Sequence, residues 1–137
     1  DKLSEHIKSN KRTVYLPVMR SSGYDGQNAF DFPDPAMING NRKSSTIAPQ
    51  ALYLMNSPLI HRCSNALAEI HKKATSNTPI SNRINWMILH LLSRPATKNE
   101  ILRVENFIHT YSPGNEQTAW AAFARTLFAS NEFLYIE

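Results

Sequence analysis

Two aspartates stand close together in a proline-rich stretch, and their carboxylates are the groups of this chain best placed to do chemistry. Asp31 and Asp34 lie in the segment Phe30-Asp31-Phe32-Pro33-Asp34-Pro35. Two neighbouring carboxylates could act as general acid and base, or could supply oxygen ligands to a hard cation such as calcium. An aspartate beside proline also fixes a turn and caps backbone N–H groups. We favour this structural interpretation over a reactive site.

A string of polar residues follows, flanking the first predicted helix, which is short. Arg42 could form a bidentate ion pair with Asp31 or Asp34 and so attach the loop to the helices. An arginine beside a helix N-terminus could instead help to bind an anion or a sugar. The candidate polar cluster, with either a structural or a binding role, consists of Asp31, Asp34, Arg42, Thr46, Gln50 and Asn56.

The histidines and the single cysteine do not form a catalytic or metal-binding pattern. No two of the five histidines are three or four residues apart, which excludes the two-histidine helix motif. We expect solvated or singly hydrogen-bonded histidines and no metal site. Cys63 falls in a predicted apolar stripe with Leu59 and Leu67, so we expect a buried and inert thiol. The chain holds no complete catalytic set, and whether it takes part in an enzyme stays open.

The composition is that of a globular domain. The chain has 137 residues, of which 42% are hydrophobic and 19% charged. Its net charge of +4 is spread along the whole length, so we expect no nucleic-acid partner. A single cysteine rules out an internal disulfide and the attachment motif of c-type haem, so we expect no cofactor in this chain. We find no apolar run of the length that spans a membrane.

Helical periodicity begins near residue 48, and prolines mark its interruptions. Apolar residues recur at three- or four-residue spacing in five segments, at about 49–55, 58–74, 79–93, 97–111 and 116–130. Ser57 is placed to cap the second of these helices. Thr97 and Glu100 have the spacing of a capping box, which predicts the start of the fourth helix.

Residues 1–47 lack this periodicity. The segment from Thr13 to Met19 is rich in strand formers, but Pro17 lacks a ladder donor, so we expect extended chain or an edge strand at most. Glycines and prolines between residues 21 and 41 predict an irregular loop. At the other end of the chain, Phe133, Leu134 and Tyr135 are expected to dock on the helices.

These patterns predict a mainly α fold. We expect a bundle of about five helices with an extended N-terminal segment and a long loop wrapped on it. Residues 1–137 are predicted to form a single domain, with 1–47 as the extended and loop segment and 48–137 as the helical core. The start of the sequence, without an initiator Met or a signal peptide, predicts a fragment of a larger protein.

Several segments together resemble the C-terminal planctomycete-specific domain called domain of unknown function 1553. The resemblance covers nearly the whole chain and is most specific between Arg42 and Asn56. The segments that carry it are Lys11–Arg20, Phe30–Pro35, Arg42, Ser45–Pro58, Leu91–Thr97 and Leu127–Tyr135.

The resemblance implies a large exported protein, periplasmic or at the cell surface. It also implies upstream domains of the same protein as partners, including a cytochrome c-like module that could carry haem. Many relatives have a cysteine shortly before the position of Arg42, but this chain has the segment 37–41 without one. A metal-ligand or redox role of that cysteine is therefore not carried over.

Three hypotheses about function remain. The first is a C-terminal helical domain with a structural or substrate-contacting role and no self-sufficient catalytic site. The second places the loop with Asp31, Asp34 and Arg42 in a hydrolytic site for polysaccharide, completed by upstream residues. The third is a docking domain for an electron-transfer assembly. We favour the first and keep carbohydrate as a possible binding partner.

Overall fold

The computed structural model describes residues 9, 11–15, 18, 25–30, 32–33, 36–38, 40 and 47–135 of the chain. These residues form helices and connecting turns, with no strand among them, which confirms the mainly α fold. The chain divides into two units, residues 1–53 and residues 54–137, called unit 1 and unit 2 below. The single domain expected from the sequence stays a prediction.

Unit 1 contains short helical elements where the sequence predicts extended or irregular chain. A 3₁₀ turn, η1, spans Thr13–Tyr15, and α2 spans Asp25–Ala29. The expectation of extended chain is wrong at η1, where the Tyr15 N–H donates to the Arg12 carbonyl at 2.9 Å. The described residues provide no strand to pair with, so the backbone donor is satisfied locally. The irregular loop expected for residues 21–41 is likewise interrupted by α2.

The helix α3 spans Ile47–Asn56 and includes the last residues of unit 1. Tyr53 of α3 lies against α2, where a Cβ atom on Gly26 would be only 2.7 Å from the Tyr53 hydroxyl. The ring of Phe30 meets the Tyr53 ring edge-on, with centroids 6.1 Å apart. The absence of a side chain at Gly26 therefore allows this close approach.

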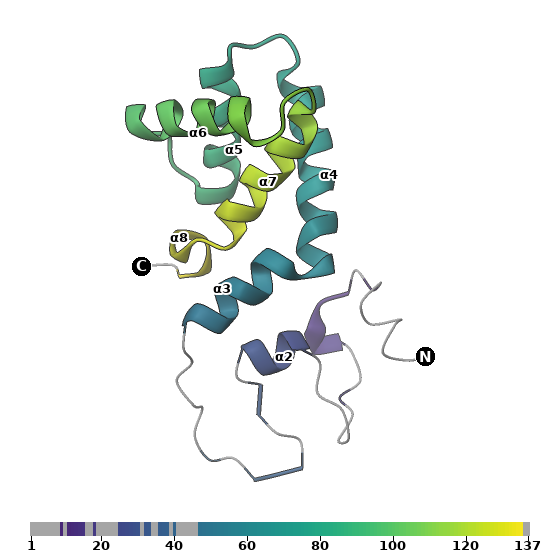
Figure 1. Ribbon diagram of the computed structural model, residues 1–137. Helices are drawn as coiled ribbons and strands as arrows, with labels where there is room; N and C mark the ends of the chain where they lie inside the picture. The colour runs from purple at the N-terminus through teal and green to yellow at the C-terminus, as the bar shows by residue number, and fades with distance from the viewer. Residues whose placement is uncertain are drawn as a thin grey trace. The chain divides into compact units, whose positions relative to one another are not determined.

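Unit 2 holds the long helices that the sequence predicts. They are α4 (Pro58–Thr75), α5 (Ile80–Leu92), α6 (Lys98–Tyr111) and α7 (Glu116–Phe128), followed by the short α8 (Asn131–Leu134). Figure 1 shows α7 running beside α4, and these two helices make the most extensive helix–helix contact in the described part of the chain.

The core of unit 2 is built from α5, α6 and α7, with α4 contributing a small side chain. Its largest members come from two of these helices, Trp120 from α7 and the α5 residues Ile84, Met87 and Ile88. The full set of buried apolar residues is Ala68, Ile84, Met87, Ile88, Val104, Ile108, Ala119, Trp120, Ala121, Phe123 and Ala124. The shared apolar interior expected from helical periodicity is present in this unit.

The face that α4 buries differs from the face that the sequence predicts. Its buried residues are Ser64, Ala68, His71 and Thr75. Small side chains there allow close packing. The hydroxyls of Ser64 and Thr75 donate to the carbonyls of His61 and His71, at 3.0 Å and 2.7 Å. Because these hydroxyls bond within the helix, they are buried without losing hydrogen bonds.

Most of the predicted apolar stripe of α4 consequently faces away from the core, although Leu67 packs against it. Leu59 is 41% exposed, and Cys63 is exposed as well. The expectation of a buried Cys63 thiol is therefore wrong. The prediction failed because hydrophobic periodicity identifies an apolar face of a helix. The packed face of α4 instead carries mostly small side chains, which allow close helix packing.

Helix ends follow the predicted capping chemistry closely. The capping box of α6 is confirmed, since Thr97 accepts from the Glu100 N–H and Glu100 accepts from the Thr97 N–H. Ser57 occupies the N-cap of α4 as predicted, but its side chain makes no capping bond. At the C-terminus, the Phe133 ring contacts the Phe128 ring with centroids 5.2 Å apart. Phe133 and Tyr135 nevertheless stay 39% and 47% exposed, so docking is shallower than expected.

Candidate functional site

Most of the polar cluster predicted from the sequence lies outside the described residues. Asp31, Asp34, Arg42 and Thr46 belong to this undescribed part, so their predicted roles stay predictions. Gln50 is buried, whereas Asn56 is exposed at the end of α3. These two residues are six positions apart, which places them on different sides of the helix.

A second polar cluster, which the sequence did not indicate, lies in unit 2 where α4, α5 and α7 meet. We call it the His71 cluster: His71, Arg83, Trp86, Glu116 and Trp120. The His71 side chain is 0% exposed. Its ring lies against the Trp120 indole with centroids 4.2 Å apart, and against the Trp86 indole at 5.5 Å. The imidazole is thus held between two aromatic rings.

Hydrogen bonding sets the tautomer of His71. Its Nε2 atom is 3.1 Å from the Arg83 carbonyl oxygen. A carbonyl can only accept, so Nε2 carries the proton and Nδ1 is the bare nitrogen of a neutral ring. Among the described residues, Nδ1 has no hydrogen-bond partner. A neutral histidine is therefore the species that fits this position.

Glu116 joins the other members of the His71 cluster. Its Oε1 atom accepts from the Trp120 Nε1–H at 2.9 Å and from the Arg83 guanidinium at 2.6 Å. The same guanidinium lies over the Trp120 ring, 4.8 Å from the centroid. Arg83 comes from α5, whereas Glu116 and Trp120 come from the first turns of α7. One carboxylate oxygen thereby links two helices and satisfies a buried indole.

The electrostatics of the His71 cluster agree with this geometry. Burial lowers the pKa of His71 below its usual 6.5, and the nearby Arg83 charge lowers it further. The hydrogen bond from Trp120, together with the Arg83 charge, lowers the pKa of Glu116. The cluster therefore holds a neutral imidazole and an ionised carboxylate at neutral pH.

The chemistry open to the His71 cluster is limited by burial. A general base must come within hydrogen-bond reach of a substrate proton. His71 has no exposed surface, and Trp120 is 1% exposed. Glu116, by contrast, has a side chain that is 53% exposed, so the enclosed part of the cluster is the imidazole and the Trp120 ring at the junction of the three helices. The spacing of Glu116 and Trp120, four residues apart at a helix start, was the one signal in the sequence that could have indicated it.

A second set of charges fixes the end of unit 2. Arg94 donates to both carboxylate oxygens of Glu100, at 3.0 Å and 2.7 Å, and also to Glu132 Oε2 at 2.9 Å. The hydrogen bond from Arg94 is the main cause that lowers the pKa of Glu100 to about 2. Because Glu100 also closes the capping box, one guanidinium connects the start of α6 to α8.

The surface of unit 2 carries two shallow depressions. One, of about 280 Å³, lies between α4 and α7 and is lined by Asn65, Ala66, Glu69, Gln117, Thr118, Ala121 and Arg125. The other, of about 380 Å³, is lined by Ile80, Ile108, His109, Ser112, Pro113, Gly114 and Glu116. Both are open to solvent, and neither contains His71.

Within the described ranges, no group of three or more histidine, cysteine, aspartate or glutamate side chains is arranged to hold a metal ion. In the same part of the chain, we find no helix with the length and apolar character needed to cross a membrane.

The comparisons with known proteins identify a family. A family model described as "Protein of unknown function (DUF1553)", PSD1, matches residues 2–108. This match covers most of the chain, so the protein is a member of the DUF1553 family. No curated protein and no solved structure gives a significant match.

Proposed function

We propose that this chain is a structural module of a larger exported protein, and that it contacts upstream domains of the same protein. In this proposal unit 2 supplies a stable helical body, and the charged side chains act in stability. The module has no self-sufficient catalytic site. The resemblance of the sequence to exported multidomain proteins supports the proposed context.

The observation that carries this proposal is the pair of interactions made by the Glu116 carboxylate. Its carboxylate satisfies the buried Trp120 indole and pairs with Arg83. The pairs of Arg94 with Glu100 and Glu132 are similar, since they join the α5–α6 connection to α6 and to α8. These three ion pairs therefore connect different segments of unit 2, as expected of groups that stabilise a fold.

Unit 1 offers the contact surface in this proposal. Large apolar side chains are exposed along its described residues, namely Val14, Tyr15, Phe32, Met37 and Ile38. Apolar groups that stay in water in such numbers favour an interaction surface. The upstream domains of the same protein are the partner we propose for it.

The test is a titration of the 137-residue chain with the separately produced upstream part of the same protein, followed by calorimetry. We expect binding, and we expect the double variant Tyr15→Asp/Ile38→Asp to weaken it by about tenfold or more, because both side chains would be buried at the interface. The matched control is Leu102→Asp, which changes an exposed apolar residue on α6 of unit 2.

Helical content measured by circular dichroism shows whether each variant is folded. Absence of binding by the folded wild-type chain would overturn the proposal. Cleavage of a polysaccharide by the chain alone would also overturn it, and would favour the hydrolytic alternative.

A further inference from the structure

The helix α4 carries an apolar stripe on the side opposite its packed face. We call this surface the α4 stripe: Leu59, Cys63, Ala66 and Ile70. These residues recur at four, three and four positions, so they form one line along the helix. Leu59 is 41% and Ile70 57% exposed, and both Cys63 and Ala66 are exposed.

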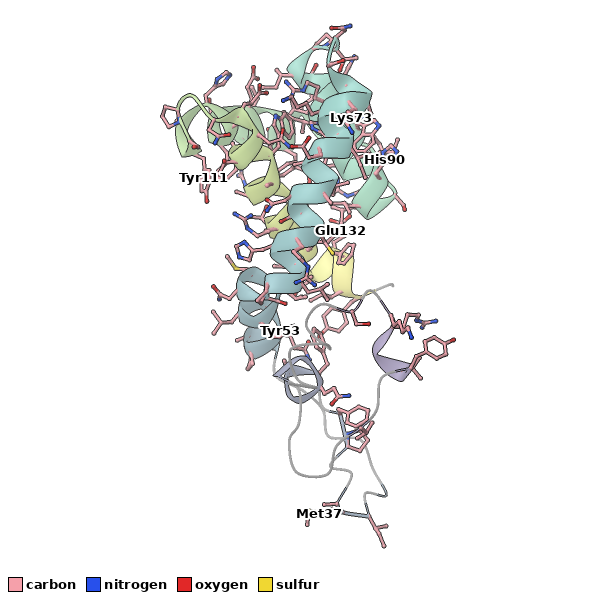
Figure 2. All side chains as sticks on the ribbon, turned by 90° about the vertical axis from the view of Figure 1, so that its right-hand side faces the viewer. Met37, Tyr53, Lys73, His90, Tyr111 and Glu132 are labelled. Carbon is pink, nitrogen blue, oxygen red and sulfur yellow. The ribbon has the colours of Figure 1, made fainter. Side chains whose placement is uncertain are left out.

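The position of α4 in unit 2 leaves this line accessible. Figure 2 shows α4 at the front of unit 2, with Lys73 near its upper end and no other helix between it and the viewer. The buried residues Ser64, Ala68, His71 and Thr75 occupy the opposite side of the helix. The helix α4 therefore packs through Leu67 and through small and polar residues, and the apolar line that it exposes favours an interaction surface.

The charged residues beside the α4 stripe can pair with the same residues of a second copy of the chain. Arg62 and Glu69 lie seven residues apart, which is two helical turns or about 10 Å, on the same edge of the stripe. In an antiparallel pair of α4 helices related by a two-fold axis, Arg62 of each copy faces Glu69 of the other. A parallel pair would not bring Arg62 opposite Glu69, because the two residues lie on the same edge of the helix.

The side chains near the centre of the stripe also suit this pairing. Ala66 lies between the two charged positions, and its small side chain lets two helices approach closely. Glu69 accepts a hydrogen bond from Gln117 Nε2 at 3.1 Å through Oε1. This bond holds the carboxylate at the α7 side of the stripe, and Oε2 is the atom that would accept from Arg62 of the second copy.

We propose that the chain forms a homodimer through the α4 stripe, with the two α4 helices antiparallel and Arg62 of each copy paired with Glu69 of the other. The interface is isologous, so the apolar line of one copy covers the same line of the other. This assembly goes beyond the module function proposed above, because it concerns unit 2 and a different partner.

The test measures the mass of the 137-residue chain in solution by sedimentation equilibrium. We expect a dimer for the wild type. Ile70→Glu places a charge in the apolar line and should raise the dimer dissociation constant by well over tenfold. The control Leu102→Glu changes a residue that is 60% exposed on α6, away from the stripe, and should leave the dimer unchanged.

A charge-reversal series tests the antiparallel pairing itself. Arg62→Glu and Glu69→Arg should each weaken the dimer by about tenfold, because each places like charges opposite one another. The double variant Arg62→Glu/Glu69→Arg restores opposite charges and should recover most of the affinity. Circular dichroism confirms that each variant keeps its helical content.

Three results would overturn the proposal. The first is a wild-type chain that sediments as a monomer at every soluble concentration. The second is equal weakening by Ile70→Glu and Leu102→Glu. The third is a charge-reversed double variant that dimerises no better than the single variants. A monomeric chain whose Cys63 is protected from alkylation only in the longer protein would assign the stripe to an upstream segment instead.

Discussion

The imidazole of His71 lies 4.2 Å from the indole of Trp120, centroid to centroid, and both side chains are withdrawn from solvent. The two residues are 49 positions apart in the chain, on α4 and α7. Their contact joins the two helices that pack most extensively in unit 2. Changes to the groups around this pair should therefore alter the free energy of unfolding.

The first prediction concerns pH. Burial lowers the pKa of His71 in the folded chain below its unfolded value of 6.5, so the unfolded chain binds more protons at mildly acidic pH. The corresponding stabilisation is complete above pH 6.5 and is lost as the pH falls from 6.5 toward the lowered pKa. Urea unfolding of the wild type should therefore show a lower free energy of unfolding at pH 5.5 than at pH 7.5.

A variant isolates the contribution of His71 to this slope. His71→Phe keeps a ring between the two indoles but removes the titrating group. Its free energy of unfolding should vary less between pH 7.5 and 5.5 than that of the wild type. An unchanged slope in this variant would show that other groups cause the pH dependence.

The second prediction concerns the capping box of α6. Thr97→Ala removes the side chain that accepts from the Glu100 N–H and should lower the free energy of unfolding by about 1 kcal/mol. Thr110→Ala is the matched control, because Thr110 is an exposed threonine within the same helix whose hydroxyl donates to its own helix backbone. Urea unfolding at pH 7 should show a loss only for Thr97→Ala.

The third prediction concerns the attachment of α8. Arg94→Lys keeps the positive charge but removes the planar guanidinium, which donates to both Glu100 and Glu132. A lysine ammonium group cannot make the same set of hydrogen bonds. Amide hydrogen exchange should accelerate at Phe133, Leu134 and Tyr135, whose N–H groups donate within α8. The control Arg103→Lys, an exposed position on α6, should leave these rates unchanged. Equal rates in both variants would mean that Arg94 does not hold α8.

The helix boundaries of unit 2 could be predicted from the sequence because local chemistry determines them. Prolines at 58 and 79, the Thr97 capping box and the stop at residues 112–115 all act within a few residues of the backbone they affect. Where local chemistry competes with packing, the sequence is less informative. The apolar periodicity of α4 predicted the wrong packed face, since the buried positions of this helix are Ser64, Ala68, His71 and Thr75.

The His71 cluster could not be predicted, because its contacts join residues far apart in the chain. Arg83 and Glu116 are 33 positions apart, and no local pattern relates them. The same holds for Arg94 and Glu132, which are 38 positions apart. Such pairs depend on the relative placement of whole helices, which hydrophobic periodicity does not specify.

The fourth prediction tests the polar cluster derived from the sequence. If Asp34 pairs with Arg42 as a structural clasp, Asp34→Ala should lower the free energy of unfolding by about 1–3 kcal/mol, because Arg42 would lose its partner. Urea unfolding of the 137-residue chain measures this change. An Asp34→Ala variant as stable as the wild type would contradict the clasp and favour a binding or reactive role.

The fifth prediction concerns Glu116 and tests the central claim that the charged groups of unit 2 stabilise the fold. Glu116→Ala leaves the buried Trp120 Nε1–H without its acceptor, and Glu105→Ala on α6 is the control. Catalytic groups are often held at a cost in stability, so their removal tends to leave a protein equally or more stable. If Glu116 has a structural role, its removal should instead lower the free energy of unfolding.

The decisive measurement is therefore the free energy of unfolding of Glu116→Ala in urea at pH 7. We predict a loss of about 1–3 kcal/mol relative to the wild type, with little change for Glu105→Ala. A Glu116→Ala variant that is as stable as the wild type, or more stable, would contradict the account.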